Sequence, residues 1–187
     1  KAGEALEACD ACLAVSPQYS AALGYKGIAL DEVGDREGVR RLMDYDRLVR
    51  PSPIEVPESF SGLESFNRAL ADHILNHPTL EEDPGLNATR NGLHTKELLS
   101  EPLGPFAEFQ QVLQRKAQAY LHEIPSDPSH PFTASKPSSF KLTIWAVVMN
   151  DGGHQISHTH GDGYISGVYY VQIPDVVARS GNGQEGW

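Results

Sequence analysis

The sequence has few cysteines and no long apolar run, and these two deficits exclude several classes of protein. Two cysteines in 187 residues are too few for a disulfide framework. The longest apolar run, at 144–149, is far too short to span a membrane, and no signal peptide comes before the first expected helix. The sequence therefore predicts a cytoplasmic protein without a membrane partner.

Basic residues are also in short supply. The chain has 15 lysines and arginines against 25 aspartates and glutamates, which gives a formal net charge of −10. A protein that binds nucleic acid needs a basic surface to contact the phosphate backbone. We therefore expect no nucleic-acid partner, and the acidic balance is ordinary for a soluble protein.

The two cysteines are close together. Cys9 and Cys12 form a Cys-x-x-Cys sequence, which is compatible with zinc or redox chemistry. A zinc site would need a second pair of ligands nearby, and the sequence offers none. Because residues three apart on a helix share a face, we interpret both cysteines as small core residues of a helical repeat.

The first fifty residues contain a repeated pattern. The four residues that end at Pro17 align with the four that end at Pro51, at the 34-residue period of tetratricopeptide repeats. Apolar spacing predicts helices over 5–13, 19–33 and 39–48, with a turn at Gly34-Asp35. We therefore predict a tetratricopeptide-type helical repeat over 1–50, truncated at its N-terminus, with earlier repeats before it.

Prolines mark the next two boundaries. Three prolines within 51–59 predict a linker, and four within 125–138 predict a long loop. Between them, apolar residues at helical spacing predict helices near 63–74 and 106–121, which we expect to cover a sheet. The polar stretch that joins these helices, at 76–102, is expected to be mostly loop.

Two later segments are typical of strands. Residues 140–149 are apolar at nearly every position, which predicts a strand covered on both faces. Asp-Gly-Gly at 151–153 then predicts a hairpin-type turn. The alternating run at 164–173 predicts the next strand, which ends at Pro174 because proline cannot donate to the ladder.

Three of the eight histidines gather between these predicted strands. If the backbone from His158 is extended, residues two apart face the same side, so His158, His160 and Asp162 would converge. Two imidazoles and a carboxylate with open positions match the facial triad of non-haem Fe(II) oxygenases. A polar histidine-rich loop at a sheet edge is the alternative interpretation. His154 is a weaker candidate, and His94 is interpreted as structural because no partner stands near it in the sequence.

The residues that follow the histidines resemble a known family. Tyr-Ile-Ser-Gly-Val-Tyr-Tyr-Val at 164–171, directly behind the His-x-His at 158–160, resembles the 2-oxoglutarate/Fe(II)-dependent oxygenases that often carry N-terminal tetratricopeptide repeats. The same order of features is kept along the chain, at 64–67, 92–95, Trp145, 152–153 and Pro174. The resemblance therefore covers most of the chain, with the helical repeat in front.

This resemblance implies an α+β chain, in which residues 60–187 form the N-terminal part of the oxygenase domain. That domain would be an incomplete double-stranded β-helix, jelly-roll or cupin-like, with covering helices. Fe(II) is the implied metal and 2-oxoglutarate the implied cosubstrate, whose oxidative decarboxylation to succinate and CO₂ accompanies hydroxylation of a substrate C–H bond. The implied enzyme is a 2-oxoglutarate/Fe(II)-dependent dioxygenase.

Parts of the family's pattern are missing. The family builds its barrel from about eight strands, and only three or four can be placed here. Its distal histidine ligand and the arginine or lysine that pairs with 2-oxoglutarate have no counterparts, since Arg179 is the sole basic residue after Pro174 and no histidine follows. We therefore expect this chain to be a fragment of a longer parent, truncated at both ends and inactive alone.

The predicted ligand set has two versions. His158 and His160 stand where the subfamily has His-x-His, whereas His160-Gly161-Asp162 would restore the wider superfamily's His-x-Asp pair. We slightly prefer His158 and His160 because of their register before Ser-Gly-Val at 166–168. Asp162 is kept as a third candidate for the metal.

Two further functions compete with the oxygenase. Helical repeats commonly bind peptides, so the parent could be a non-catalytic adaptor with a degenerate barrel. A cupin-like zinc or manganese protein would use the histidines without 2-oxoglutarate. A degenerate barrel has no reason to keep three potential ligands on one strand face, which favours a metal protein. The repeats favour a protein or peptide substrate, and a small molecule is the alternative.

Overall fold

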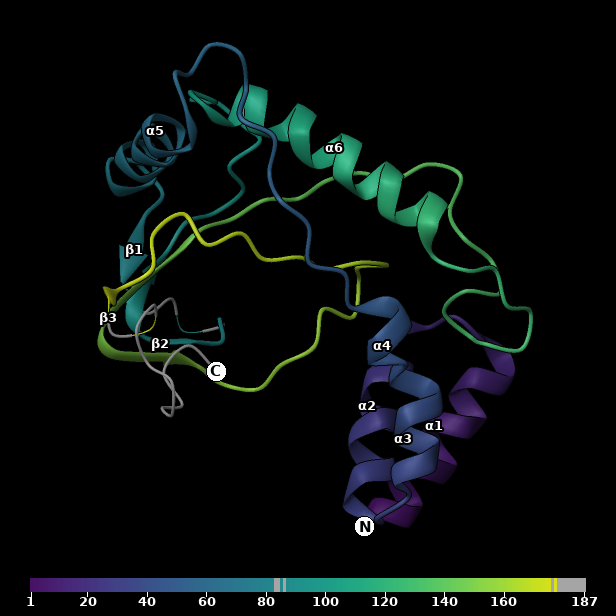
Figure 1. Ribbon diagram of the computed structural model, residues 1–187. Coiled ribbons are helices and arrows are strands. Elements are labelled where there is room, and N and C mark those ends of the chain that lie inside the picture. Colours follow the sequence, from purple (N-terminus) through teal and green to yellow (C-terminus); the bar gives the residue numbers. More distant parts are fainter. Residues whose placement is uncertain (83–84, 86, 176, 178–187) are drawn as a thin grey trace. The chain divides into compact units, whose positions relative to one another are not determined.

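The computed structural model describes residues 1–82, 85, 87–175 and 177, and the chain divides into two compact units. The first unit combines Lys1–Pro53, Leu113–Lys141 and Ser157–Ser166. The second combines Ile54–Val112, Leu142–Ile156 and the segment from Gly167 onward. Helices and a small antiparallel sheet are both present, which confirms the α+β class (Figure 1). The predicted domain boundaries around the linker at 51–59 stay a prediction.

Helices fill the first fifty residues. They are α1 (Ala2–Val15), α2 (Ser20–Glu32), α3 (Arg36–Met43) and α4 (Tyr45–Leu48). α1 packs on α2 and α2 on α3, and their short connections make neighbouring helices antiparallel (Figure 1). All of residues 1–50 are described and none lies in a strand, so the predicted helical module is confirmed. Its identity as a tetratricopeptide repeat stays a prediction.

Local sequence explains where these helices begin and end. Gly34 adopts a φ of 80°, a left-handed conformation that glycine tolerates without a steric cost. The carboxylate of Asp35 then caps α3 by accepting a hydrogen bond of 2.9 Å from the N–H of Gly38. At Asp44 the backbone is again left-handed, with φ 42° and ψ 48°. This residue divides the single helix predicted over 39–48 into α3 and α4.

The first unit buries few large side chains. Its buried apolar residues are Ala22, Ala29, Leu30 and Ile124, and its buried polar residues are His130 and Thr133. No residue of α1 is fully buried, and Cys9 and Cys12 are half-buried free thiols on that helix. The cysteines therefore lie at a helix surface, and the prediction that they are core residues is only partly confirmed.

The second unit is built around aromatic rings. Phe66 on α5 (Leu63–Leu75) packs against Phe109 on α6 (Phe106–Glu123), with ring centroids 5.6 Å apart. Phe60 and Tyr169 extend this cluster at 5.0 Å from Phe66 and 5.3 Å from Phe109, respectively. Leu70 and Leu98, which belong to the same unit, are also fully buried. Both helices predicted from apolar spacing are confirmed, and their covering of a sheet stays a prediction.

Within the described residues, the sheet has three antiparallel strands in the order β1 (Glu81–Glu82), β2 (Thr89–His94) and β3 (Val147–Gln155). Arg90 pairs with His154 and Gly92 pairs with Met149, so residues 150–153 lie opposite Asn91 alone. They form a large bulge within β3, in which Gly152 has a φ of 72°. The predicted hairpin-type turn at 151–153 is therefore wrong, because the chain continues in the same strand after it.

Three other strand predictions need correction. β1 and β2 lie in the segment that was expected to be mostly loop. The strand predicted over 140–149 begins only at Val147, although the carbonyls of Ile144 and Ala146 accept hydrogen bonds from Leu98 and Thr95. The strand predicted over 164–173 is absent from these residues, all of which are described.

The alternation at 164–173 has a different physical basis. Tyr169 faces inward, where its hydroxyl donates to Oδ1 of Asn67 at 2.6 Å and its ring packs on Phe109. Its neighbours Val168 and Tyr170 are 74% and 58% exposed. The two-residue alternation therefore identified the inward-facing side chain correctly. However, aromatic contacts hold this segment instead of the backbone hydrogen bonds of a strand. The double-stranded β-helix stays a prediction, and no helix in the described part of the chain is long and apolar enough to cross a membrane.

Candidate metal site

His158 and His160 lie side by side in the first unit. Their ring centroids are 4.8 Å apart, the rings meet edge to face at 84°, and both residues are exposed. Because a metal–imidazole bond is about 2 Å long, two imidazoles held cis on one ion have ring centres roughly 4.5–5.3 Å apart. The spacing of the pair therefore fits joint binding of a single metal ion.

Helix α2 fixes the direction in which this pair points. Thr159 packs on Gly24, where an added Cβ would lie 3.1 Å from the threonine methyl group. A Cβ added to Gly161 would lie 2.9 Å from the Cβ of Ala21, and Ser20 donates its hydroxyl to the Gly161 carbonyl at 2.6 Å. Side chains alternate along an extended backbone, so a threonine turned toward α2 leaves both histidines on the opposite side. Small residues on α2 thus position the pair.

The electrostatics of the pair also suit metal binding. The pKa of His160 is lowered from its ordinary value, first by desolvation and second by the charge of His158. A lowered pKa keeps the imidazole neutral near pH 7. Because a metal ion binds only neutral imidazole, a lowered pKa at His160 favours metal binding.

Asp162 is separated from the two histidines by a turn. The N–H of Gly163 donates to the carbonyl of His160 at 3.1 Å, so the backbone does not stay extended through Asp162. Among the described residues, no three His, Cys, Asp or Glu side chains are grouped so as to hold a metal ion. The structure brings His158 and His160 together and leaves Asp162 apart. The assignment of all three as ligands stays a prediction.

The other two candidate histidines lie in the second unit. His154 pairs with Arg90 across the sheet and is exposed. His94 stacks on Trp145, with ring centroids 6.3 Å apart, and its Nδ1 donates to the carbonyl of Thr95. His94 therefore makes structural contacts, as its sequence context predicted.

A pocket of roughly 230 Å³ lies beside the turn that follows His160. Its lining comes from three separate parts of the first unit, namely Gln18, Ser20, Leu23, Pro131, Phe132, Asp162, Gly163 and Tyr164. Phe132 and Tyr164 stack with ring centroids 4.4 Å apart, and the Tyr164 hydroxyl donates to the Phe132 carbonyl at 2.6 Å. Sequence analysis missed Phe132 because it lies in a proline-rich loop with no periodic pattern.

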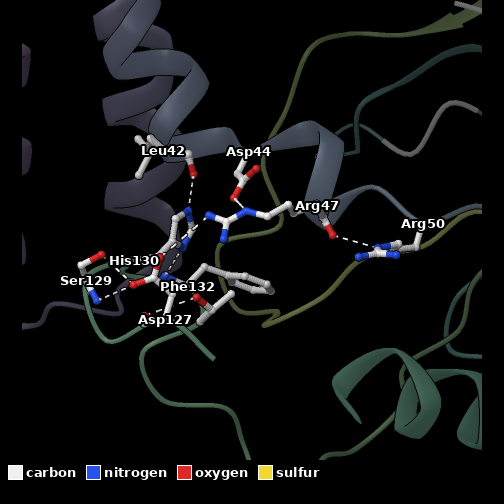
Figure 2. A network of polar contacts seen from close by, with 9 residues as sticks. Leu42, Asp44, Arg47, Arg50, Asp127, Ser129, His130 and Phe132 are labelled. Atoms are coloured by element: carbon white, nitrogen blue, oxygen red, sulfur yellow. Dashed lines mark hydrogen bonds and ion pairs between the residues drawn. The ribbon is translucent and has the colours of Figure 1, made fainter. Parts of the chain in front are cut away.

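Figure 2 shows how the loop that carries Phe132 is held against α3 and α4. The N–H of Phe132 donates to Nδ1 of His130 at 3.2 Å, so Nε2 carries the ring hydrogen. Nε2 in turn donates to the carbonyl of Leu42 at 3.2 Å, near the end of α3. His130 is buried, and it therefore links the pocket wall to the helical module through both ring nitrogens.

The same loop carries a second attachment. Oδ1 of Asp127 accepts hydrogen bonds from the N–H and the hydroxyl of Ser129, at 2.9 and 2.6 Å. Its other oxygen lies 3.9 Å from Arg47 of α4, which also pairs with Asp44 (Figure 2). The Ser129 hydroxyl, above all, holds the pKa of Asp127 below its ordinary value. Asp127 is therefore anionic at neutral pH and favours this loop conformation.

Residues 143–185 match the model of a family described as "Putative 2OG-Fe(II) oxygenase". The matched segment includes β3, the histidine pair, Asp162 and Tyr164. No curated protein and no solved structure matches the chain. Over this segment the chain is similar to oxygenases whose family description names Fe(II) and 2-oxoglutarate.

Proposed function

We propose that this chain belongs to a 2-oxoglutarate- and Fe(II)-dependent dioxygenase in which His158 and His160 bind the metal. The observation that carries the proposal is the pair itself: two exposed imidazoles with centroids 4.8 Å apart, inside the segment that matches the oxygenase family. A histidine-rich surface loop would not need two rings turned to the same side of one backbone segment.

The residues present fit part of the implied metal site. His158 and His160 supply two nitrogen ligands, whereas Asp162 lies beyond the turn that follows His160 and is not assigned to the metal here. Bound Fe(II) with 2-oxoglutarate supplies the oxidising chemistry for hydroxylation of a C–H bond. The chain keeps one ligand neutral by desolvation and holds the direction of both through the packing of Thr159 on Gly24.

The finer architecture belongs to the same proposal. The 34-residue spacing and the antiparallel packing of α1, α2 and α3 support a tetratricopeptide-type repeat over 1–50. The antiparallel sheet supports a contribution of β2 and β3 to a double-stranded β-helix. Such repeats commonly bind peptides, so we propose a protein or peptide substrate.

The test is Fe(II)-dependent conversion of 2-oxoglutarate to succinate by the protein that contains this chain. His158→Ala and His160→Ala should each abolish turnover, because each removes a metal ligand. Both side chains are exposed, so thermal denaturation should show that the variants fold as the wild type does. His94→Ala and the Cys9→Ala/Cys12→Ala double variant are the controls and should retain turnover.

The rival functions give different results in the same assay. A zinc or manganese protein would lose metal binding in the two histidine variants but would make no succinate even as wild type. A repeat-based adaptor would bind no metal at these residues. Succinate production retained in both histidine variants would overturn the proposed site.

A further inference from the structure

The pocket beside the histidine pair offers negative charge and hydrogen-bond acceptors. Asp162 contributes an exposed carboxylate, and among the described residues no lysine or arginine forms an ion pair with it. Gln18 donates its amide to the Ser135 carbonyl at 3.1 Å, which leaves the side-chain oxygen as an acceptor. None of the described residues that line the pocket is basic.

One wall of the pocket is aromatic. Phe132 and Tyr164 stack nearly parallel, at an interplanar angle of 18°. Stacking covers one face of each ring, so a cation can meet only the outer face of one ring, whose quadrupole attracts it and adds to the attraction of a nearby carboxylate. The Tyr164 hydroxyl already donates to the Phe132 carbonyl, so it is not available to donate to an anion. The aromatic wall and the Asp162 carboxylate therefore both favour a positively charged ligand.

The size of the pocket limits its occupant. A volume of roughly 230 Å³ is below the range of about 300–1,000 Å³ typical of sites for drug-sized ligands. One side chain or a small amine fits such a space. 2-Oxoglutarate carries two carboxylates, and it would meet Asp162 with no lysine or arginine in the lining to offset the repulsion. The described lining therefore favours a cation over the cosubstrate.

We infer that this pocket binds an alkylammonium or guanidinium group, with Asp162 as the ion-pair partner and Phe132 and Tyr164 as the aromatic wall. Asp162 follows His160 by two residues, so the cation would be anchored next to the metal pair. The inference rests on the proposed function and names its substrate class, a lysine or arginine side chain of a peptide or a free amine. It also assigns Asp162 to the substrate instead of to the metal.

The experiment is an NMR titration of the ¹⁵N-labelled protein that contains this chain, followed at the amides of Ser20, Gly163 and Tyr164. The probes are acetyl-Gly-Lys-Gly-amide, the matching norleucine peptide, which has a neutral side chain of similar length, and n-butylamine. We expect the lysine peptide to bind at least about fivefold more tightly than the norleucine peptide, as an added cation–π contact and ion pair would give. Tighter binding of the peptide than of butylamine indicates a peptide substrate, and the reverse indicates a small amine.

Asp162→Asn should remove the preference for the lysine peptide while Fe(II) affinity stays unchanged. Asp151→Asn, an equal loss of charge at an exposed aspartate of β3, should leave both properties as in the wild type. Equal binding of the lysine and norleucine peptides by the wild type would overturn the inference. Loss of Fe(II) binding in Asp162→Asn would overturn it too, because the carboxylate would then be a metal ligand.

Failure of this inference is distinguishable from failure of the proposed function. His158→Ala should lose Fe(II) and still prefer the lysine peptide, because the histidine does not line the pocket. If His158→Ala and His160→Ala both keep Fe(II) while Asp162→Asn loses the lysine preference, the pocket is a cation site and the proposed metal pair is wrong.

Discussion

The two units of this protein are stabilised in different ways. In the second unit Phe66, Leu70 and Leu98 are fully buried, and aromatic rings pack around Phe66 and Phe109. The first unit buries few large apolar side chains and depends on particular polar contacts, such as those of His130. The candidate metal pair and the pocket both belong to the first unit.

This difference has a consequence for function. Segments that bind ligands are commonly drawn from the less stable parts of a protein, whereas apolar cores hold the rest of the fold. Changes in the second unit should therefore alter stability most, and changes in the first should alter binding at smaller cost to stability.

Phe66→Ala should have the largest effect on stability. The ring is fully buried and contacts Phe60 and Phe109, so its removal should cost about 3–5 kcal/mol of unfolding free energy. Urea denaturation followed by tryptophan fluorescence measures this loss. Leu63→Ala, on the exposed side of the same helix, is the control and should change stability by less than about 1 kcal/mol. If Phe66→Ala also lowered the unfolding free energy by less than about 1 kcal/mol, the aromatic cluster would not be the core of this unit.

His130→Ala should have an intermediate effect. It leaves the Leu42 carbonyl and the Phe132 N–H without their side-chain partner, at a cost of about 1–3 kcal/mol. Far-UV circular dichroism during urea denaturation reports this loss in the helical unit. The same substitution at His122, which is exposed on α6, should be close to neutral. Equal effects at the two positions would argue against a structural role for the His130 contacts.

Acid should weaken the second unit through His77. This residue is buried, its Nε2 has no hydrogen-bond partner among the described residues, and its pKa is lowered from 6.5 by desolvation and then by His73. The folded state therefore favours the neutral ring, so stability is full above pH 6.5 and falls as pH drops through 6.5 toward the lowered pKa.

Urea denaturation at pH 8 and pH 5 tests this dependence. His77→Gln should lose less stability between the two pH values than the wild type does, because glutamine does not titrate. His122→Gln should behave as the wild type, since that histidine is exposed. If His77→Gln keeps the full acid sensitivity of the wild type, another group is responsible.

Gly24→Ala should alter binding more than stability. An alanine favours the helix by up to about 1 kcal/mol, but its Cβ would lie 3.1 Å from the Thr159 methyl group and push the histidine segment outward. We expect weaker Fe(II) binding with unchanged or higher thermal stability, measured by anaerobic calorimetry and thermal denaturation. Gly3→Ala on α1, where an added Cβ meets no atom within 4 Å, should leave Fe(II) affinity unchanged. Unchanged Fe(II) affinity in Gly24→Ala would mean that α2 does not position the pair.

Local sequence patterns predicted some elements of the two units and missed others. Apolar spacing located α2, α5 and α6, each of which buries apolar side chains, and it also located α1, which packs on α2 without a fully buried residue. β2 was missed because its sequence, Thr-Arg-Asn-Gly-Leu-His, is mostly polar and joins the sheet through its backbone. Residues 164–173 alternate as a strand would, but Tyr169 finds its partners on helices α5 and α6.

At the candidate site, too, the local sequence pattern predicted the feature it determines, and the features that depend on tertiary contacts were missed. His-x-His spacing was enough to bring His158 and His160 together, since residues two apart share a side. The turn after His160 could not be foreseen from an assumed extended backbone, and it separates Asp162 from the pair. The pocket needs Phe132 from a distant loop, and the link of that loop to α3 through His130 is a purely tertiary contact.

Anaerobic calorimetric titration of Fe(II) into the protein that contains this chain tests the central claim most directly. His154→Ala is the matched control, because it removes an exposed histidine of β3 only four residues before the pair. The proposed metal pair predicts that His158→Ala and His160→Ala each weaken Fe(II) binding by about 100-fold or more, while His154→Ala binds as the wild type does. Wild-type Fe(II) affinity in both His158→Ala and His160→Ala would contradict it.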